Sequence, residues 1–304
     1  MFDFQKIKQQ IDFEYEYGIR EFEITGGEPS EYLELRKVCE YILEKDNSCK
    51  LCIITNGGLY NSDVWDLIDE VLISYHLGRN TNSYDKSMFP LGSTYSKVKK
   101  TIDKANENNV FVRTNTVIGT FNAAYLDTIV DDLIEFNPRI VNFLPVNIFD
   151  EAKDMVSCID YNMFRECIKH AIDKLNANID TKIFVRYMPF CCMAGYEKYI
   201  VGTLQHIYDK HDWNVELDGV DILDKAANKE KSLAKLGSYG STSIATALQI
   251  RKNSYEKTLK CIACKYNILC DGVEKTEDKS LLKYIEPSNG KLIKNILYFL
   301  HNYD

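Results

Sequence analysis

Three cysteines near the C-terminal end of the chain have the spacing of a metal site. Cys261, Cys264 and Cys270 form a C-x2-C-x5-C run. Thiolates separated by two residues can chelate one metal centre, and a third sulfur a few residues later can close a compact knuckle around it. The natural source of a fourth donor is the segment Pro189-Phe190-Cys191-Cys192, because it follows a predicted strand at residues 182–188.

The cysteine set alone leaves the metal open. Four thiolates can hold a [4Fe–4S] cluster or a structural zinc ion. Cys192 stands next to Cys191 and is the alternative fourth ligand. The chain has ten cysteines and no signal-peptide pattern, so we expect the clustered ones to bind metal rather than to form disulfides.

A second candidate site is a glycine-rich turn that carries a carboxylate. Gly26, Gly27, Glu28 and Pro29 follow the β-rich segment 20–25. Two residues without side chains expose backbone carbonyls and Glu28 adds negative charge, a combination that suits a ligand ammonium group. The same residues can also form a plain strand-to-helix turn, in which glycine supplies unusual dihedral angles and proline starts the helix.

Helices and strands that alternate along the chain must position these residues. The hydrophobic spacing predicts strands at 20–25, 50–55, 70–76, 110–118, 139–146 and 182–188, and helices at 4–17, after Ser30, near 61–69, around Val98, Leu126 and Phe164, and at the C-terminal end around Leu292. Such alternation predicts a parallel sheet, whose ligands bind at the carboxyl ends of the strands. Asn56, Ser74 and Asn115 lie at or near those ends.

The charge balance argues against a nucleic-acid partner. Thirty-seven Lys and Arg residues against 45 Asp and Glu residues give a formal net charge of −8. A surface of this sign repels phosphate backbones and anionic lipids. The chain also has no apolar run of the length that a membrane span needs. We therefore expect a soluble cytoplasmic protein with no nucleic-acid or membrane partner.

The order of the strand-end turns resembles the radical S-adenosylmethionine (SAM) superfamily. The matching segments, in chain order, are GGEP, TNG, ISYH and RTNTVIGTFN. The resemblance implies an α/β fold, a partial (β/α)6 TIM-like barrel over residues 1–187 that lacks its first strand. It also implies that SAM is held by Gly26, Gly27, Glu28, Pro29, Asn56, Ser74 and Asn115, with Val117 and Ile118 near the adenine.

The C-terminal cysteines resemble the auxiliary-cluster segments of the SPASM and twitch type. The run PFC-x3-GYE at 189–197, followed by C-x2-C-x5-C, carries this likeness. It implies a small metal-binding segment at 188–304, in which Cys191, Cys261, Cys264 and Cys270 bind an auxiliary [4Fe–4S] cluster, with zinc as the alternative. Glu274 stands where the full SPASM pattern has another cysteine, so a second auxiliary cluster is not expected.

The catalytic cluster of the superfamily is held by a CxxxCxxC loop, and residues 1–23 contain no cysteine. Cys49 and Cys52 do not replace that loop, because Cys52 falls within a predicted strand. A misplaced start, a split enzyme and a degenerate relative would each explain the missing ligands. We expect truncation or splitting, and in a split enzyme a separate polypeptide would supply the loop. We also expect this chain alone not to cleave SAM reductively.

The functional expectation is a radical SAM enzyme that modifies a peptide or protein through a 5′-deoxyadenosyl radical when the missing loop is supplied. The alternative is a catalytically silent barrel that binds SAM or a peptide and is folded by its zinc or iron–sulfur knuckle. The sequence assigns no catalytic residue in either case.

Overall fold

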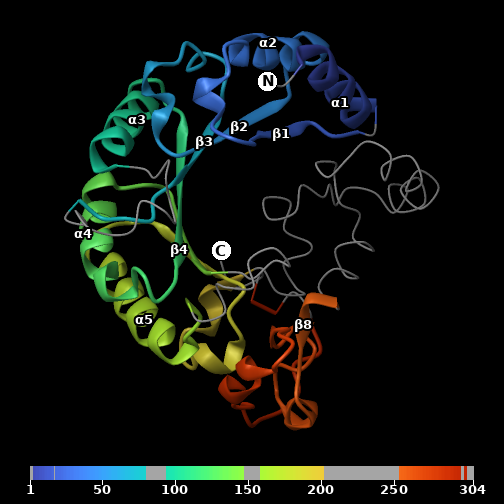
Figure 1. The fold of residues 1–304 in the computed structure, drawn as a ribbon, viewed down its shortest axis with the longest axis vertical. Coiled ribbons are helices and arrows are strands. Elements are labelled where there is room, and N and C mark those ends of the chain that lie inside the picture. Colours follow the sequence, from blue (N-terminus) through green and yellow to red (C-terminus); the bar gives the residue numbers. More distant parts are fainter. Residues whose placement is uncertain are drawn as a thin grey trace.

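The computed structural model describes residues 3–16, 18–79, 94–146, 158–201, 253–295 and 298–299 of the 304-residue chain. Seven strands form one sheet: β1 (Glu21–Ile24), β2 (Lys50–Thr55), β3 (Glu70–Ser74), β4 (Phe111–Ile118), β5 (Ile140–Pro145), β6 (Lys182–Arg186) and β7 (Ile200–Val201). Each strand pairs in parallel with the next one in the chain. The sheet curls into an open half-barrel (Figure 1), which confirms the predicted partial TIM-like barrel.

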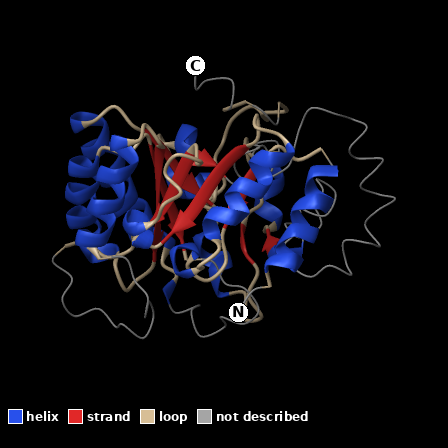
Figure 2. Ribbon diagram, turned by 90° about the horizontal axis from the view of Figure 1, so that it is seen from above, coloured by secondary structure: helices blue, strands red, loops and turns tan. Residues whose placement is uncertain are grey.

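The helices lie on the convex side of this sheet (Figure 1), and Figure 2 shows helices flanking the strands. They are α1 (Phe4–Glu16), α2 (Leu35–Lys45), α3 (Tyr95–Glu107), α4 (Leu126–Phe136) and α5 (Tyr161–Asn178). Successive residues of a strand point to opposite faces, so every second strand residue meets the helices. Val141 and Phe143 of β5 are fully buried in this way, as are Ile129 and Leu133 of α4. The intervening strand residues face the concave side.

The predicted helix near 61–69 is wrong. Over these residues the structure has a short 3-10 turn, η2 (Gly58–Asn61), followed by irregular turns up to β3. Arg36 of α2 explains the difference, because its guanidinium binds the backbone carbonyl of Asp63 and the carboxylate of Asp66. A helix would need the Asp63 carbonyl for its own ladder. Tertiary contact therefore overrides the local hydrophobic spacing.

Two other helix predictions change in detail. Ser30 does not cap α2, which begins at Leu35; it lies in a 3-10 turn, η1 (Pro29–Glu31), that precedes the helix. Near the C-terminal end, residues 291–295 are not helical, and the other positions of that predicted helix lie outside the described residues.

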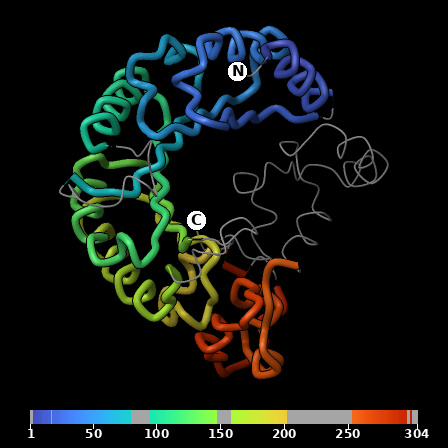
Figure 3. Tube along the Cα trace, viewed as in Figure 1, coloured from blue at the N-terminus to red at the C-terminus, as the bar shows by residue number. Residues whose placement is uncertain are grey.

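The described part of the C-terminal segment, residues 253–295 and 298–299, is irregular. It contains a two-stranded antiparallel ladder, β8 (Tyr255–Glu256) with β9 (Val273–Glu274), and the 3-10 turns η8 (Leu259–Ala263) and η9 (Ser280–Tyr284). Figure 3 shows this segment and the N-terminal strands at opposite ends of the arc. Among the described residues, no helix combines the length and the apolar character needed to cross a membrane.

Aromatic rings join the C-terminal segment to the half-barrel. Phe190, which follows β6, stacks on Tyr266 with ring centroids 5.0 Å apart. Tyr161 of α5 meets Tyr284 edge to face at 5.4 Å. All four rings are buried in the same apolar core. Such ring pairs add to the stabilisation that comes from buried apolar area, so they hold the segment firmly against the barrel.

Candidate cofactor sites

Four cysteines from two distant segments line one cavity. Cys191 lies in the 3-10 turn η5 (Phe190–Met193) directly after β6, whereas Cys261, Cys264 and Cys270 come from the C-terminal segment. Cys192 is not among the residues that line the cavity; its buried thiol instead points to the carbonyl oxygen of Tyr284 at 3.8 Å. The structure thus brings together the four thiols that the sequence analysis grouped, with Cys191 rather than Cys192 facing the cavity.

Two of these sulfurs accept hydrogen bonds. The amide of Gly272 lies 3.3 Å from Sγ of Cys270, and that of Phe190 donates to the same sulfur. The thiol of Cys192 donates to Cys191 and lowers the pKa of Cys191 to about 7, against the opposing effect of burial. Burial raises the pKa of Cys270 to about 12. Hydrogen bonds to sulfur favour the thiolate, which is the form that binds metal.

Gly272 can only be glycine at this position. Its φ is +98°, and a Cβ built on it would lie 2.0 Å from the carbonyl oxygen of Glu256 in β8. The close approach of the two backbones fixes the loop that carries Cys270. It also aims the Gly272 amide at the sulfur.

The donor set leaves the metal open, because four thiolates can hold a zinc ion or an iron–sulfur cluster. Within the described part of the chain, no three Cys, His, Asp or Glu side chains lie close enough together to hold a metal ion. The four thiols instead surround a shared cavity whose other walls include Phe190, Tyr266 and Ile285. An iron–sulfur cluster supplies its own core and is held by thiolates from around it.

The glycine turn after β1 opens onto free space. Gly26 and Gly27 have φ values of +101° and +56°, and nothing lies within 4 Å of a Cβ built on either. Glycine is therefore needed for the dihedral angles and leaves the backbone accessible. The buried ring of Pro29 starts the turn η1 that follows.

The carboxylate of Glu28 ties the β1 turn to the β2 turn. It accepts hydrogen bonds from the hydroxyl of Thr55 at 2.6 Å, the backbone amide of Asn56 at 2.7 Å and the hydroxyl of Ser30 at 2.8 Å. Thr55, which the sequence analysis did not select, is thus part of the turn. These bonds occupy the Glu28 carboxylate, so the backbone of Gly26 and Gly27 is the part of the turn that faces free space.

The Asn56 turn is locked to α3. Asn56 accepts a hydrogen bond from the Gly58 amide through its side-chain oxygen at 3.1 Å. Gly57 has a φ of +93°, and a Cβ on it would come within 2.9 Å of Val98. Thr101 of α3 donates to the Gly57 carbonyl at 2.7 Å. The turn therefore has a fixed backbone before any ligand arrives.

Ser74 and Asn115 occupy neighbouring positions on the concave face. They are register partners in β3 and β4, and Asn115 pairs in turn with Asn142 of β5. The amide of Asn142 donates to the side-chain oxygen of Asn115 at 2.7 Å. Asn142 was not selected from the sequence; the signal for it was a lone amide inside the apolar run RIVNFLPV. Asn56 directly follows Thr55, the register partner of Ile73, and so belongs to the same level.

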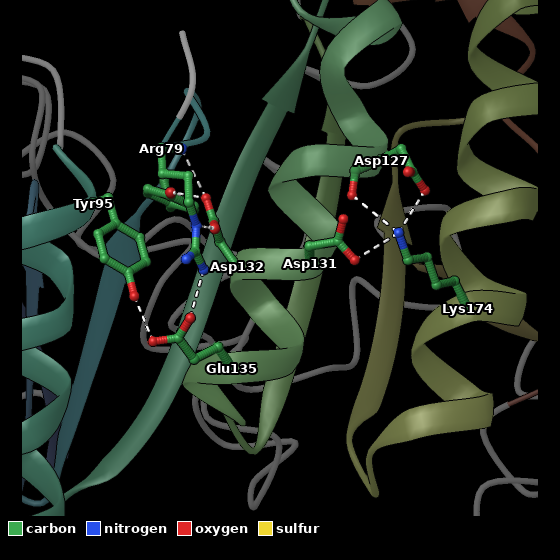
Figure 4. A network of polar contacts seen from close by, with 8 residues as sticks. Arg79, Tyr95, Asp127, Asp131, Asp132, Glu135 and Lys174 are labelled. Carbon is green, nitrogen blue, oxygen red and sulfur yellow. Dashed lines mark hydrogen bonds and ion pairs between the residues drawn. The ribbon is translucent and has the colours of Figure 1, made fainter.

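The chain after β3 is held by the neighbouring strand and helices. His76 accepts a hydrogen bond from the amide of Val117 through Nδ1 at 3.1 Å, and burial lowers its pKa to about 4. The imidazole is therefore neutral at pH 7. Figure 4 shows how Arg79 reaches Asp132 and Glu135 of α4, beside the ring of Tyr95. The buried Asp132 also accepts from the Arg79 amide at 2.8 Å. These contacts fix the segment that follows Ser74.

A buried ion-pair group closes the base of the concave face. Arg113 of β4 is 4% exposed and pairs with Glu70 and, at 3.1 Å, with Glu23. Its guanidinium also lies 3.7 Å from Sγ of Cys52, and burial raises the pKa of that thiol. Cys52 therefore belongs to a structural network within β2, in agreement with the expectation that it does not replace a cluster loop.

Part of the chain matches a known family in sequence comparison. Residues 2–133 match the radical SAM superfamily model. The chain is 20% identical over 211 residues to the antilisterial bacteriocin subtilosin biosynthesis protein AlbA of Bacillus subtilis (strain 168), an alignment that covers 67% of this chain and 47% of that protein. It is 32% identical over 141 residues to a GTP 3′,8-cyclase of Clostridium perfringens (strain SM101 / Type A), which covers 45% of this chain and 42% of the cyclase.

Solved structures resemble the chain over part of its length. Streptococcus suis SuiB is 15% identical, with a TM-score of 0.47, and covers 60% of this chain and 42% of its own. Native anSMEcpe with bound AdoMet is 17% identical, with a TM-score of 0.48, and covers 60% of this chain and 55% of its own. The chain thus spans less than half the length of the two sequence relatives named above. The similarity of the chain to the radical SAM superfamily thus rests on residues 2–133.

Proposed function

We propose that this chain supplies the SAM-binding barrel and an auxiliary-cluster segment of a radical SAM enzyme that modifies a peptide or protein. The observation that carries the proposal is the cavity shared by Cys191, Cys261, Cys264 and Cys270 on a barrel of this superfamily. The similarity to a protein of bacteriocin biosynthesis favours a peptide as the substrate. In this proposal residues 1–187 form the barrel and residues 188–304 form a SPASM- or twitch-like segment.

The SAM site in this proposal lies along the carboxyl ends of β1 to β4. The open backbone of Gly26 and Gly27 would hold the amino group of the methionine part, while Glu28 and Pro29 fix the turn. Asn56, Ser74 and Asn115 would bind the nucleoside part from the three following strands. Because α3 and the His76 contacts fix these turns beforehand, little reorganisation would accompany binding.

The auxiliary centre would be held by the four cavity thiols. An iron–sulfur cluster supplies one-electron chemistry and a Lewis-acidic iron. The chain contributes sulfurs that receive N–H hydrogen bonds, an aromatic wall of Phe190 and Tyr266, and restricted solvent access. Hydrogen bonds and burial of this kind tune the reduction potential of a cluster.

Radical chemistry would also require the CxxxCxxC loop that holds the catalytic cluster. Residues 1–23 carry no cysteine, so we propose that the active form includes such a loop on a joined or a separate polypeptide. The residues described above would then bind SAM and place the substrate.

Metal counting tests the auxiliary centre. After anaerobic reconstitution with iron and sulfide, the wild-type chain should hold about four iron and about four sulfide per chain. Cys191→Ser should lose most of that load. Cys192→Ser is the matched control, because Cys192 does not line the cavity and serine still carries a hydroxyl that can donate to Cys191, so it should keep the load. A single zinc without sulfide, or loss in the Cys192 variant alone, would refute the assignment.

SAM cleavage tests the enzymatic part. The chain is mixed with, or fused to, a segment that carries a CxxxCxxC loop, reduced with dithionite, and assayed for 5′-deoxyadenosine. We expect product only when the loop is present and its cysteines are intact. A loop variant with serine at all three positions is the control. If the chain binds SAM but does not cleave it with any of the loop segments tested, the result would favour the catalytically silent binding barrel instead.

A further inference from the structure

Asn142 carries a buried acceptor with no donor among the described residues. Its side chain is 0% exposed, and its Oδ1 has no hydrogen-bond partner. The Nδ2 of the same amide is used, because it donates to Asn115 Oδ1 at 2.7 Å. A buried carbonyl oxygen without a donor is unfavourable, so native structures provide a partner for nearly all of them.

The position of Asn142 shows where that partner must come from. Val141 and Phe143 on either side are buried against the helices, so Asn142 faces the concave side of the half-barrel. Its register partner in β4 is Asn115, whose own partner in β3 is Ser74. Asn142 is therefore the next polar member of the row that the proposed SAM site already contains, one strand further along.

The residues next to this polar row, nearer the carboxyl ends of the strands, indicate which part of a ligand would contact the row. Two residues nearer the strand ends, Val117 and Leu144 are register partners and form an apolar pair. A flat aromatic base suits such an apolar pair, whereas a sugar suits the polar row beneath it. Hydroxyl groups both donate and accept, so a ribose hydroxyl could donate to Asn142 and also accept from a neighbour in the row.

We infer that Asn142 is a SAM-binding residue whose Oδ1 accepts a hydrogen bond from a ribose hydroxyl of the nucleoside. This inference rests on the proposed function, and it adds a contact from β5 to a site otherwise built from β1 to β4. Asn142 also orients Asn115 through the amide bond, so it acts both directly and by positioning.

Titration calorimetry on the full chain tests the inference with SAM and its 2′-deoxy and 3′-deoxy analogues. Wild type should bind one of the two analogues roughly tenfold more weakly than SAM, the usual effect of one lost hydrogen bond to a buried group. Asn142→Leu keeps the side-chain volume but removes the acceptor, so it should bind SAM and that analogue equally. Asn142→Asp keeps an acceptor and should restore the discrimination.

Ile140→Val is the matched control, because Ile140 lies on the same face of β5 two residues nearer the base. It should bind as wild type does, and unfolding curves confirm that all variants fold. Equal affinity of wild type for SAM and both analogues would overturn the inference, and so would unchanged discrimination in Asn142→Leu. Failure of wild type to bind SAM at all would overturn the proposed function as well as this inference. The two results with the analogues would overturn the inference alone.

Discussion

Substitution of Gly272 by alanine should both destabilise the C-terminal segment and impair cluster loading. Two effects contribute. The positive φ of +98° is unfavourable for any L-residue, by about 1–2 kcal/mol. The added Cβ would also lie 2.0 Å from the Glu256 carbonyl, so β8 or the Cys270 loop must move. We expect a total loss of about 3 kcal/mol, in the range of strained or overpacked sites.

Gly195→Ala separates the two effects. Gly195 has a φ of +86°, but nothing lies within 4 Å of a Cβ built there. This control should therefore lose only the dihedral contribution, about 1 kcal/mol. Urea unfolding measures both losses, and iron and sulfide counts after reconstitution measure loading. The Gly272 variant should hold less iron, because the amide that donates to Cys270 at 3.3 Å is displaced.

Equal unfolding free energies for the two alanine variants would refute this reasoning. Such a result would mean that the contact with Glu256 is relieved without cost and that φ alone matters. Full iron loading in a destabilised Gly272 variant would instead show that the Gly272 amide is not needed to hold the Cys270 sulfur.

Three further perturbations have defined outcomes. Thr55→Val removes the hydroxyl that donates to Glu28 at 2.6 Å and should lower the unfolding free energy by about 2 kcal/mol, measured in urea, with weaker SAM binding by calorimetry. The pKa of His76 is lowered to about 4 in the fold, so the unfolded chain binds a proton first as the pH falls. Stability should therefore be complete above pH 6.5 and decline towards pH 4 by at most about 3 kcal/mol; His76→Gln should flatten this decline, and an unchanged profile would exclude His76 as its source. Asp132→Asn leaves Arg79 without its buried counter-charge and should reduce stability by about 3 kcal/mol in thermal unfolding; a loss below about 1 kcal/mol would show that the pair is dispensable.

Much of the fold was predictable because the strands are continuous apolar runs bounded by turn residues. KLCIIT was predicted at 50–55 and forms β2 over Lys50–Thr55. The helix near 61–69 failed because Arg36, from another element, binds the Asp63 carbonyl. No local pattern contains such a contact.

The candidate sites also contain some residues that the sequence analysis selected and others that it missed. Cysteine spacing grouped Cys261, Cys264 and Cys270 because these residues are close in sequence, and all three line the same cavity as Cys191. Asn142 was missed because its importance lies in the register between β4 and β5, which places it beside Asn115. Thr55 was missed for a similar reason: its hydroxyl meets Glu28 only after β1 and β2 pair.

The parallel sheet explains why both candidate sites open on the same edge. All strands run in one direction, so the glycine turn after β1 and the cysteine turn after β6 leave the sheet at the same side. They lie towards opposite ends of the arc (Figure 3), with the polar row of Ser74, Asn115 and Asn142 between them on the concave face. Arg113 lies two residues before Asn115 in β4 and is occupied by its ion pairs with Glu23 and Glu70. The polar side chains that remain available to a ligand on this face therefore lie nearer the carboxyl ends of the strands.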